Sequence, residues 1–203
     1  MSMPGRDEPY TIAWERETES IVYIDQTVLP GRYEVMRCTT VEDLARAIRG
    51  LEVRGAPALG IAGAMGVALA AVRSTESDLD RFQKEVGRAA ALLRGTRPTA
   101  VNLAWGIERV ARKVAMAASV EEAKTLAVAE ANAVAEEDEE TCRRLGTFGE
   151  DLFPTDCTVL THCNAGALAC RCWGTALGVI RSAVAAGKDV QVIACETRPL
   201  NQG

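Results

Sequence analysis

The segment Thr161–Gly166 (THCNAG) contains the residues best suited to chemistry. It follows Cys157–Leu160, an apolar and β-branched stretch that predicts a buried strand. It precedes Ala167–Ala186, whose apolar residues at helical spacing predict a helix that stops at Gly187. A cysteine between the carboxyl end of a strand and the amino end of a helix lies in a field that favours the thiolate. Cys163 is therefore a candidate catalytic residue.

Two neighbours of Cys163 support a site at this turn. Asn164 supplies a polar side chain, and Gly166 would let a substrate approach the backbone. Ligands of open α/β sheets also bind at this edge. Against this interpretation, a free cysteine usually behaves as a small buried hydrophobe. These residues alone leave both interpretations open.

Arg54 and Gly55 form a second candidate site, just before the wholly apolar stretch Ala58–Val72. Pro57 suits a first helical turn, where its missing N–H would have no partner. A guanidinium, a bare backbone and a helix amino end all favour phosphate, so this segment is a candidate anion site. A turn with a solvated arginine explains the same residues equally well.

Arg97-Pro98-Thr99 resembles this arrangement. Thr99 is the predicted N-cap of a helix over Ala100–Ala117. The proline holds Arg97 extended beside that helix start, which would allow a second anion contact. Surface arginines are common, so the pattern is weak evidence by itself.

The remaining pattern predicts an α/β fold in two domains. Three strands are expected to form a small antiparallel sheet: Thr11–Trp14, Ile21–Ile24 and Tyr33–Cys38. Further helices are expected after the N-cap Thr40, over Asp78–Leu93 and over Val120–Arg144, and Gly60, Gly63 and Gly66 suggest close packing of a buried central helix.

The turn-rich segment Gly146–Asp156 predicts a domain boundary. Residues 1–146 would then form an N-terminal β/helical domain, and residues 147–203 would begin a Rossmann-like parallel α/β domain. Val190–Ala194 is its expected second parallel strand, which completes a βαβ unit.

Composition excludes several classes of function. The chain has 203 residues and a net charge of −5, which disfavours nonspecific binding to nucleic acid or to anionic membranes. Met1–Glu8 is polar and lacks the apolar core of a secretory signal, so we expect a cytoplasmic protein with reduced cysteines. No zinc site is expected, because the chain has no CxxC pair, only Cys170-Arg171-Cys172, and its one histidine leaves too few residues to complete four ligands. Neither GxGxxG nor a Walker loop is present, so no nucleotide cofactor is expected.

Four segments together resemble the methylthioribose-1-phosphate isomerase family. They are Val53–Ala58 (VRGAPA), Arg97–Leu103 (RPTAVNL), Thr161–Gly166 (THCNAG) and Glu196–Gly203 (ETRPLNQG). Their order and rough spacing match over nearly the whole chain. Related folds include ribose-1,5-bisphosphate isomerases and regulatory subunits of the translation-initiation exchange factor, and the second and third segments look more like the methylthioribose branch.

The resemblance implies a homodimeric enzyme of methionine salvage that converts a sugar 1-phosphate from aldose to ketose without metal or cofactor. Cys163 would act with an aspartate further along the chain. The phosphate and substrate contacts would come from Arg54, Gly55, Ala56, Arg97 and Gln202.

The family chain continues past Gly203, and its aspartate lies in that later part. Asp189 is no substitute, because it begins a strand at the opposite end from Cys163. We therefore expect a C-terminally truncated isomerase that is inactive by itself. The alternatives are a non-catalytic subunit of the initiation-factor type and an isomerase of another pentose 1-phosphate.

Overall fold

The computed structural model describes residues 10–198 of the chain. They form two compact units: one comprises residues 12–136, and the other comprises residues 137–198 together with Tyr10 and Thr11. The fold is mixed α/β, with a small antiparallel sheet, a helical region and a two-stranded parallel sheet. This confirms the predicted fold class.

The first unit begins with an antiparallel sheet in the order β1-β2-β3. Its strands are β1 (Ile12–Glu15), β2 (Ser20–Ile24) and β3 (Val35–Cys38), all close to the predicted ranges. Ile21 of β2 pairs with both Trp14 and Cys38, and all three side chains are buried. The sheet therefore contributes one apolar face to the core.

Helix α1 (Val41–Arg49) starts and ends where its caps predict. The Thr40 hydroxyl oxygen accepts a hydrogen bond from the Asp43 backbone N–H at 3.1 Å, and it donates to the Asp43 carboxylate at 2.7 Å. Gly50 occupies the C-cap position. The sequence predicts both ends of α1 because each cap residue is next to the helix end that it caps.

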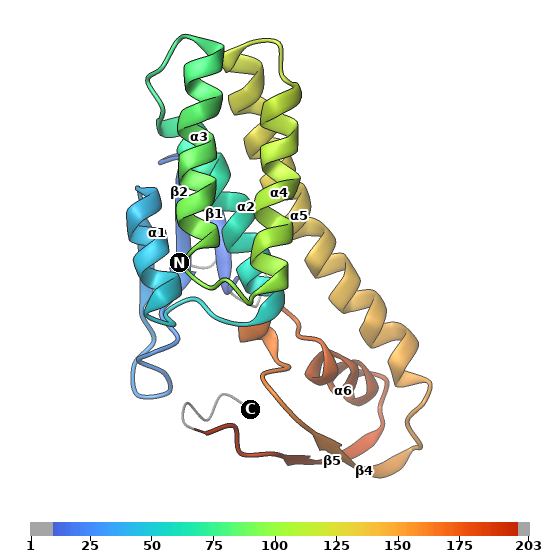
Figure 1. Ribbon diagram of the computed structural model, residues 1–203. Helices are drawn as coiled ribbons and strands as arrows, with labels where there is room; N and C mark the ends of the chain where they lie inside the picture. Colours follow the sequence, from blue (N-terminus) through green and yellow to red (C-terminus); the bar gives the residue numbers. More distant parts are fainter. Residues whose placement is uncertain (1–9, 199–203) are drawn as a thin grey trace. The chain divides into compact units, whose positions relative to one another are not determined.

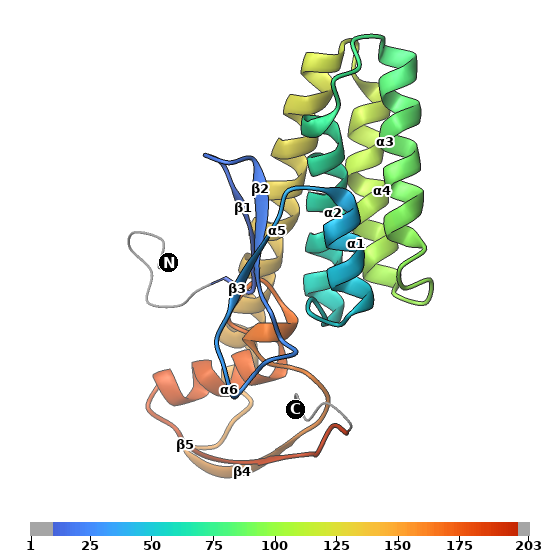
Figure 2. The ribbon, with the colours of Figure 1, turned by 90° about the vertical axis from the view of Figure 1, so that its left-hand side faces the viewer.

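Helix α2 (Ala56–Arg73) is the central element of this unit. Figure 2 shows it between the antiparallel sheet and the pair formed by α3 (Leu79–Arg94) and α4 (Val101–Met116). Among the described residues, α2 is long and apolar enough to cross a membrane, but 78% of it is buried within the protein. It is a core helix, as predicted.

Glycines permit the close approach of α2 and α4. A Cβ on Gly63 would lie 2.7 Å from the Leu103 carbonyl oxygen, and one on Gly106 would lie 2.0 Å from the Gly60 carbonyl oxygen. The two helices run in the same direction, with α3 antiparallel to them, so α2 and α4 begin at the same end of the unit (Figure 1).

The prediction that Thr99 caps α4 is wrong. Ala100 occupies the N-cap position, and no side chain caps the helix. The Ala100 backbone N–H instead donates to the Arg97 carbonyl oxygen at 3.0 Å, so Arg97-Pro98-Thr99-Ala100 forms a turn before the helix. The turn separates Thr99 from the first helical residue by one position.

Helix α5 (Val120–Glu150) is longer than predicted, because the glycines that suggested a turn are packing sites. A Cβ on Gly146 would lie 2.3 Å from the Ser182 hydroxyl oxygen, and one on Gly149 would lie 2.5 Å from a Val179 methyl carbon. The two compact units divide inside this helix, between residues 136 and 137. The expected turn therefore starts only after residue 150.

The second unit contains the predicted parallel strands, β4 (Asp156–Thr161) and β5 (Asp189–Ala194). Contrary to prediction, β4 is not buried: Leu160 is 72% exposed, and Val192 and Ile193 of β5 are also exposed. The sheet has two strands among the described residues. Both faces of a parallel sheet are normally covered by other elements, and here apolar side chains of the sheet remain exposed.

The single helix predicted over Ala167–Ala186 is interrupted. A short 3-10 turn, η1 (Ala167–Ala169), is followed by a loop and then by α6 (Ala176–Ala185). Trp173 and Gly174 adopt φ values of 63° and 100°, which no right-handed helix accommodates. The helix stop is confirmed: Gly187 has φ 86°, and the N–H groups of Gly187 and Lys188 bond back to Val184 and Ala183 as in a Schellman motif.

Candidate functional site

Arg54 is buried and hydrogen-bonded although it carries a charge. Its side chain is buried, with 7% of the residue exposed. Its Nε donates to the Gln26 side-chain oxygen at 3.2 Å, and its Nη2 donates to the Gln26 backbone oxygen at 3.1 Å. The Gln26 amide nitrogen in turn donates to the Arg54 carbonyl oxygen at 3.2 Å. Gln26 itself is 1% exposed, so this pair is part of the folded core.

One nitrogen of Arg54 lacks a partner. Nη1 is buried and makes no hydrogen bond to any described residue. Leaving a charged donor buried and unpaired costs more than the roughly 1–3 kcal/mol of a neutral group. Burial lowers the pKa of Arg54, while the nearby charge of Asp25 raises it. This arrangement favours an anion as the missing partner.

The backbone beside Arg54 also suits an anion. Gly55 has φ 101°, a conformation that L side chains rarely adopt, and it occupies the N-cap position of α2 without a side-chain cap. Ala56, the first helical residue, is exposed. Helix N-termini present unpaired N–H groups and partial positive charge, so α2 adds to the attraction of Arg54 for an anion.

Arg97 lies before the parallel neighbour of α2. Its side chain is half-buried and makes no hydrogen bond or ion pair within residues 10–198. A Cβ on Gly60 would lie 3.3 Å from the Asn102 carbonyl oxygen, so the first turns of the two helices are in contact. Thus Arg54 and Arg97 both precede helix N-termini at one end of the first unit (Figure 1).

Cys163 lies in the second unit, two residues after β4 ends. It is exposed and has φ 72°, an uncommon conformation for a residue with a side chain. The helix expected directly after it begins only at Ala176. The amino end of α6 still reaches this turn, because the Ala165 carbonyl oxygen accepts the N–H groups of Thr175 at 3.0 Å and Leu177 at 3.2 Å.

The residues around Cys163 have structural partners. Asn164 is half-buried. A Cβ on Gly166 would meet the Leu177 side chain at 3.1 Å, and one on Gly174 would lie 3.0 Å from the Gly166 Cα. Gly166 therefore permits local packing, and its expected role in substrate approach stays a prediction.

The carboxyl edge of the parallel sheet carries the chain segment after β5, as predicted. The Cys195 N–H donates to the Thr161 carbonyl oxygen at 3.0 Å, and Glu196 forms an exposed ion pair with Arg198 at 2.9 Å. Asp189 pairs with Asp156 at the opposite end of the strands from Cys163. Gln202 lies outside the described residues.

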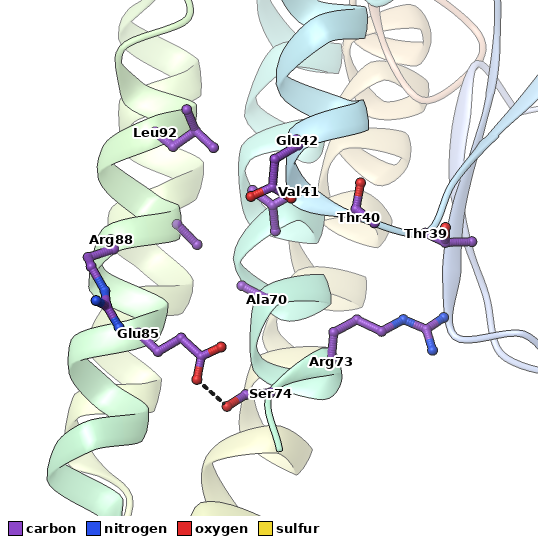
Figure 3. A pocket seen from close by; sticks show the side chains of 11 residues that line it. Thr39, Thr40, Val41, Glu42, Ala70, Arg73, Ser74, Glu85, Arg88 and Leu92 are labelled. Atoms are coloured by element: carbon purple, nitrogen blue, oxygen red, sulfur yellow. Dashed lines mark hydrogen bonds between the residues drawn. The ribbon is translucent and has the colours of Figure 1, made fainter. Parts of the chain in front are cut away.

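A separate open cavity of about 460 Å³ lies in the first unit and includes none of the predicted site residues. It is lined by the start of α1, the end of α2 and the side of α3 (Figure 3). Three of its polar groups are engaged by the protein: Ser74 donates to Glu85 at 2.6 Å, and Arg73 donates to the Thr18 carbonyl oxygen at 2.8 Å. We assign it no function.

Gln26 is the site residue that sequence reasoning missed. Its role depends on contact with Arg54, which lies 28 positions later in the chain. Nothing in the local sequence distinguishes Gln26 from an ordinary loop glutamine, because a buried amide has no sequence pattern. The one local signal is the neighbouring Asp25, a polar residue directly after an apolar strand, which is typical of a structured turn.

Comparison with known proteins gives one matching family and several relatives. The model of the Initiation factor 2 subunit family matches residues 52–203. A putative methylthioribose-1-phosphate isomerase of Archaeoglobus fulgidus is 53% identical over 95% of this chain and 56% of its own length. The 5-deoxyribose 1-phosphate isomerase of Moorella thermoacetica is 50% identical over 89% of this chain and 52% of its own. The chain thus spans just over half the length of these curated relatives.

Two solved structures resemble the chain closely. One, from A. fulgidus, is described as the translation initiation factor eIF-2B, subunit delta; it is 52% identical, with a TM-score of 0.86 over 97% of this chain and 57% of that one. The other is the 5-methylthioribose 1-phosphate isomerase of Pyrococcus horikoshii, 32% identical with a TM-score of 0.82 over 93% of this chain and 60% of that one.

Proposed function

Because the chain belongs to the Initiation factor 2 subunit family, we propose that it supplies the phosphate-binding part and the thiol of a sugar-phosphate isomerase. The reaction is the aldose–ketose conversion of 5-methylthioribose 1-phosphate to 5-methylthioribulose 1-phosphate, in methionine salvage. The observation that carries this proposal is Cys163, an exposed thiol at the carboxyl edge of a parallel sheet. A subunit that only binds has no need of a thiol there.

Each of the proposed site residues has its own role in this chemistry. The phosphate on C1 prevents the ring from opening as it does in a free sugar, so isomerisation requires assisted ring opening and proton transfer between C2 and C1. Arg54, Arg97 and the two helix N-termini would bind the phosphate dianion. Cys163 would move one proton. We place its acid–base partner in the part that the longer relatives possess beyond the matched region.

The same proposal covers the setting of the enzyme. We infer a cytoplasmic homodimer in which β4, α6 and β5 form the first βαβ unit of a larger Rossmann-like sheet, so that residues 147–203 belong to the catalytic domain. Leu160 and Ile193 pair across the two strands and share one face, and Val192 lies on the other face. All three are exposed, which supports a larger sheet, because both faces of a parallel sheet are normally covered.

The test is to complete the chain with the carboxy-terminal part of the A. fulgidus relative and to assay isomerisation. We expect turnover of 5-methylthioribose 1-phosphate by the completed chain and none by residues 1–203 alone. Assaying 5-deoxyribose 1-phosphate in parallel distinguishes the two substrates, which differ at C5. Turnover by residues 1–203 alone would show that the missing acid–base partner is unnecessary.

A non-catalytic subunit of the initiation-factor type is the second candidate, because the A. fulgidus structure of that description is so similar. A completed chain that is folded and binds phosphate esters, yet turns over neither substrate, would favour this candidate. Circular dichroism and phosphate binding by the same preparation establish that it is folded.

Phosphate binding can be tested on residues 1–203 directly. We expect Arg54→Ala and Arg97→Ala each to weaken binding of inorganic phosphate about ten- to a hundredfold, because a charge-assisted contact contributes about 1.5–3 kcal/mol. Isothermal titration calorimetry measures the affinity. Arg112→Ala is the matched control, since it removes the same charge from the last part of α4. Wild-type affinity in both site variants would refute the anion site.

A further inference from the structure

A compact group of metal-ligating side chains lies in the second unit, apart from the residues assigned above. Asp138 and Cys142 are four positions apart on α5 and therefore share one face of the helix. Cys170 follows the 3-10 turn η1. The ligating atoms of all three residues lie within 4.8 Å of one another. Cys142 and Cys170 are 2% and 0% exposed.

The surroundings hold these donor atoms in place. Cys142 and Cys170 pack together in a small buried cluster with Ala169, and Trp173 packs against this cluster. The Asp138 carboxylate accepts the Arg171 backbone N–H at 2.7 Å. Hydrogen bonds of this kind to ligand atoms orient the ligands of protein metal sites and adjust their basicity.

We propose that Asp138, Cys142 and Cys170 bind a soft divalent cation, with zinc as the best match. Two sulfurs and one carboxylate oxygen are ligands that zinc takes in tetrahedral sites, where bond lengths of about 2.0–2.3 Å space the donors roughly 3.5–3.8 Å apart. The three donor atoms lie within 4.8 Å of one another, so a shift of about 1 Å or less would bring them to that spacing. Water would complete the coordination.

Charge balance supports a cation at this position. Two thiolates and one carboxylate carry three negative charges, of which zinc neutralises two, and the charge of Arg171 acts on Asp138. Without a cation, these groups are buried together, since Cys142 and Cys170 are 2% and 0% exposed. A bound cation would displace the thiol protons and remove the cost of burying these groups.

The site would connect two segments that are distant in sequence. Asp138 and Cys142 belong to α5, whereas Cys170 belongs to the loop between η1 and α6. Trp173 and Gly174, with positive φ values, lie in the same loop. The cation would fix this loop against α5, which is a structural role. Sequence spacing could not reveal the site, because no short ligand motif is formed.

Cobalt titration of the metal-free, reduced 203-residue chain tests the proposal. We expect one equivalent of Co²⁺ to bind, with the strong visible absorption of a tetrahedral site and an ultraviolet sulfur-to-cobalt band. Zinc should displace the cobalt and abolish the spectrum. Affinity should rise with pH, because the thiols must lose protons to bind the metal.

Variants identify the ligands. Cys142→Ser and Cys170→Ser should each weaken cobalt binding at least about tenfold and reduce the sulfur-to-cobalt band, and Asp138→Asn should weaken binding while keeping that band. Cys157→Ser, which removes a cysteine on β4, is the matched control and should leave the spectrum unchanged.

Three outcomes would overturn the proposal. The first is no cobalt spectrum in the wild-type chain, and the second is an unchanged spectrum in both Cys142→Ser and Cys170→Ser. The third is a Cys142–Cys170 disulfide whose reduction does not allow the chain to bind metal. The wild-type titration decides even if a thiol variant fails to fold. Circular dichroism shows which variants keep their helices.

Discussion

Replacing Cys163 with serine in the completed chain is expected to lower kcat by about a hundredfold or more and to change KM little. A serine hydroxyl is a far weaker acid than a thiol, so it transfers a proton much less readily at neutral pH. The two side chains are similar in size, and Cys163 is exposed, so the substitution should not disturb the fold. Steady-state kinetics with 5-methylthioribose 1-phosphate measures both parameters.

Two controls sharpen this experiment. Cys157→Ser removes a thiol from β4 and should keep wild-type turnover. Phosphate binding by the Cys163→Ser chain should also be unchanged, because the proposed phosphate contacts come from Arg54 and Arg97. Near-normal turnover by Cys163→Ser would remove this thiol from the mechanism. Another polar group at the carboxyl edge of the parallel sheet would then have to transfer the proton.

Replacing Gly106 with alanine is expected to cost about 2 kcal/mol or more of unfolding free energy. The added Cβ would lie 2.0 Å from the Gly60 carbonyl oxygen and 2.8 Å from its carbon, both backbone atoms. These atoms can yield only if α2 and α4 move apart along their contact. Overpacking typically costs about 1–3 kcal/mol, occasionally more, and a 2.0 Å approach to a backbone atom places this case at or above the upper end. About 2 kcal/mol or more then remains after the gain of about 1 kcal/mol from alanine's higher helix propensity.

Gly87→Ala is the matched control for this substitution. Gly87 lies in α3, and a Cβ there would meet nothing within 4 Å. We expect that change to stabilise the protein by about 0.5–1 kcal/mol. Urea denaturation followed by tryptophan fluorescence in a Trp173→Phe background reports on the first unit, because Trp14 and Trp105 both lie in it. Equal stability of the two variants would contradict the close α2–α4 contact.

The consequence of the Gly106 substitution extends to the anion site. Arg54 and Arg97 precede the two helices that Gly106 holds together. Separating those helices would change the relative position of the two guanidinium groups. We therefore expect phosphate binding to weaken in Gly106→Ala and to stay unchanged in Gly87→Ala.

Local sequence signals determined much of this fold. The strands β1 to β3, the caps of α1, the start of α2 at Pro57 and the stop of α6 at Gly187 were all predictable. Each depends on residues within a turn or two of the feature itself. The apolar character of α2 likewise marked a buried helix without reference to its partners. Cys163, Arg54 and Arg97 could be named as candidates for the same reason, since each lies beside such a signal.

Other features were decided only by contacts between distant residues. Gly146 and Gly149 suggested a turn, but they lie within α5 because Ser182 and Val179 pack against them. Trp173 and Gly174 interrupt a stretch with helical periodicity, and the Trp173 ring packs against the guanidinium groups of Arg143 and Arg181. In both cases the tertiary contact outweighs a local preference of about 1 kcal/mol.

The candidate site shows the same division. Sequence identified Arg54 but not Gln26, and it predicted no metal site at Cys170 and did not single out Cys142. Each pair consists of side chains from segments far apart in the chain, and a buried contact between them has no periodic or local signature. Residue type and neighbouring caps therefore determine which groups can react or bind. The packing of α2, α4 and α5 decides which of those groups meet, because burial fixes side chains that solvent would leave free.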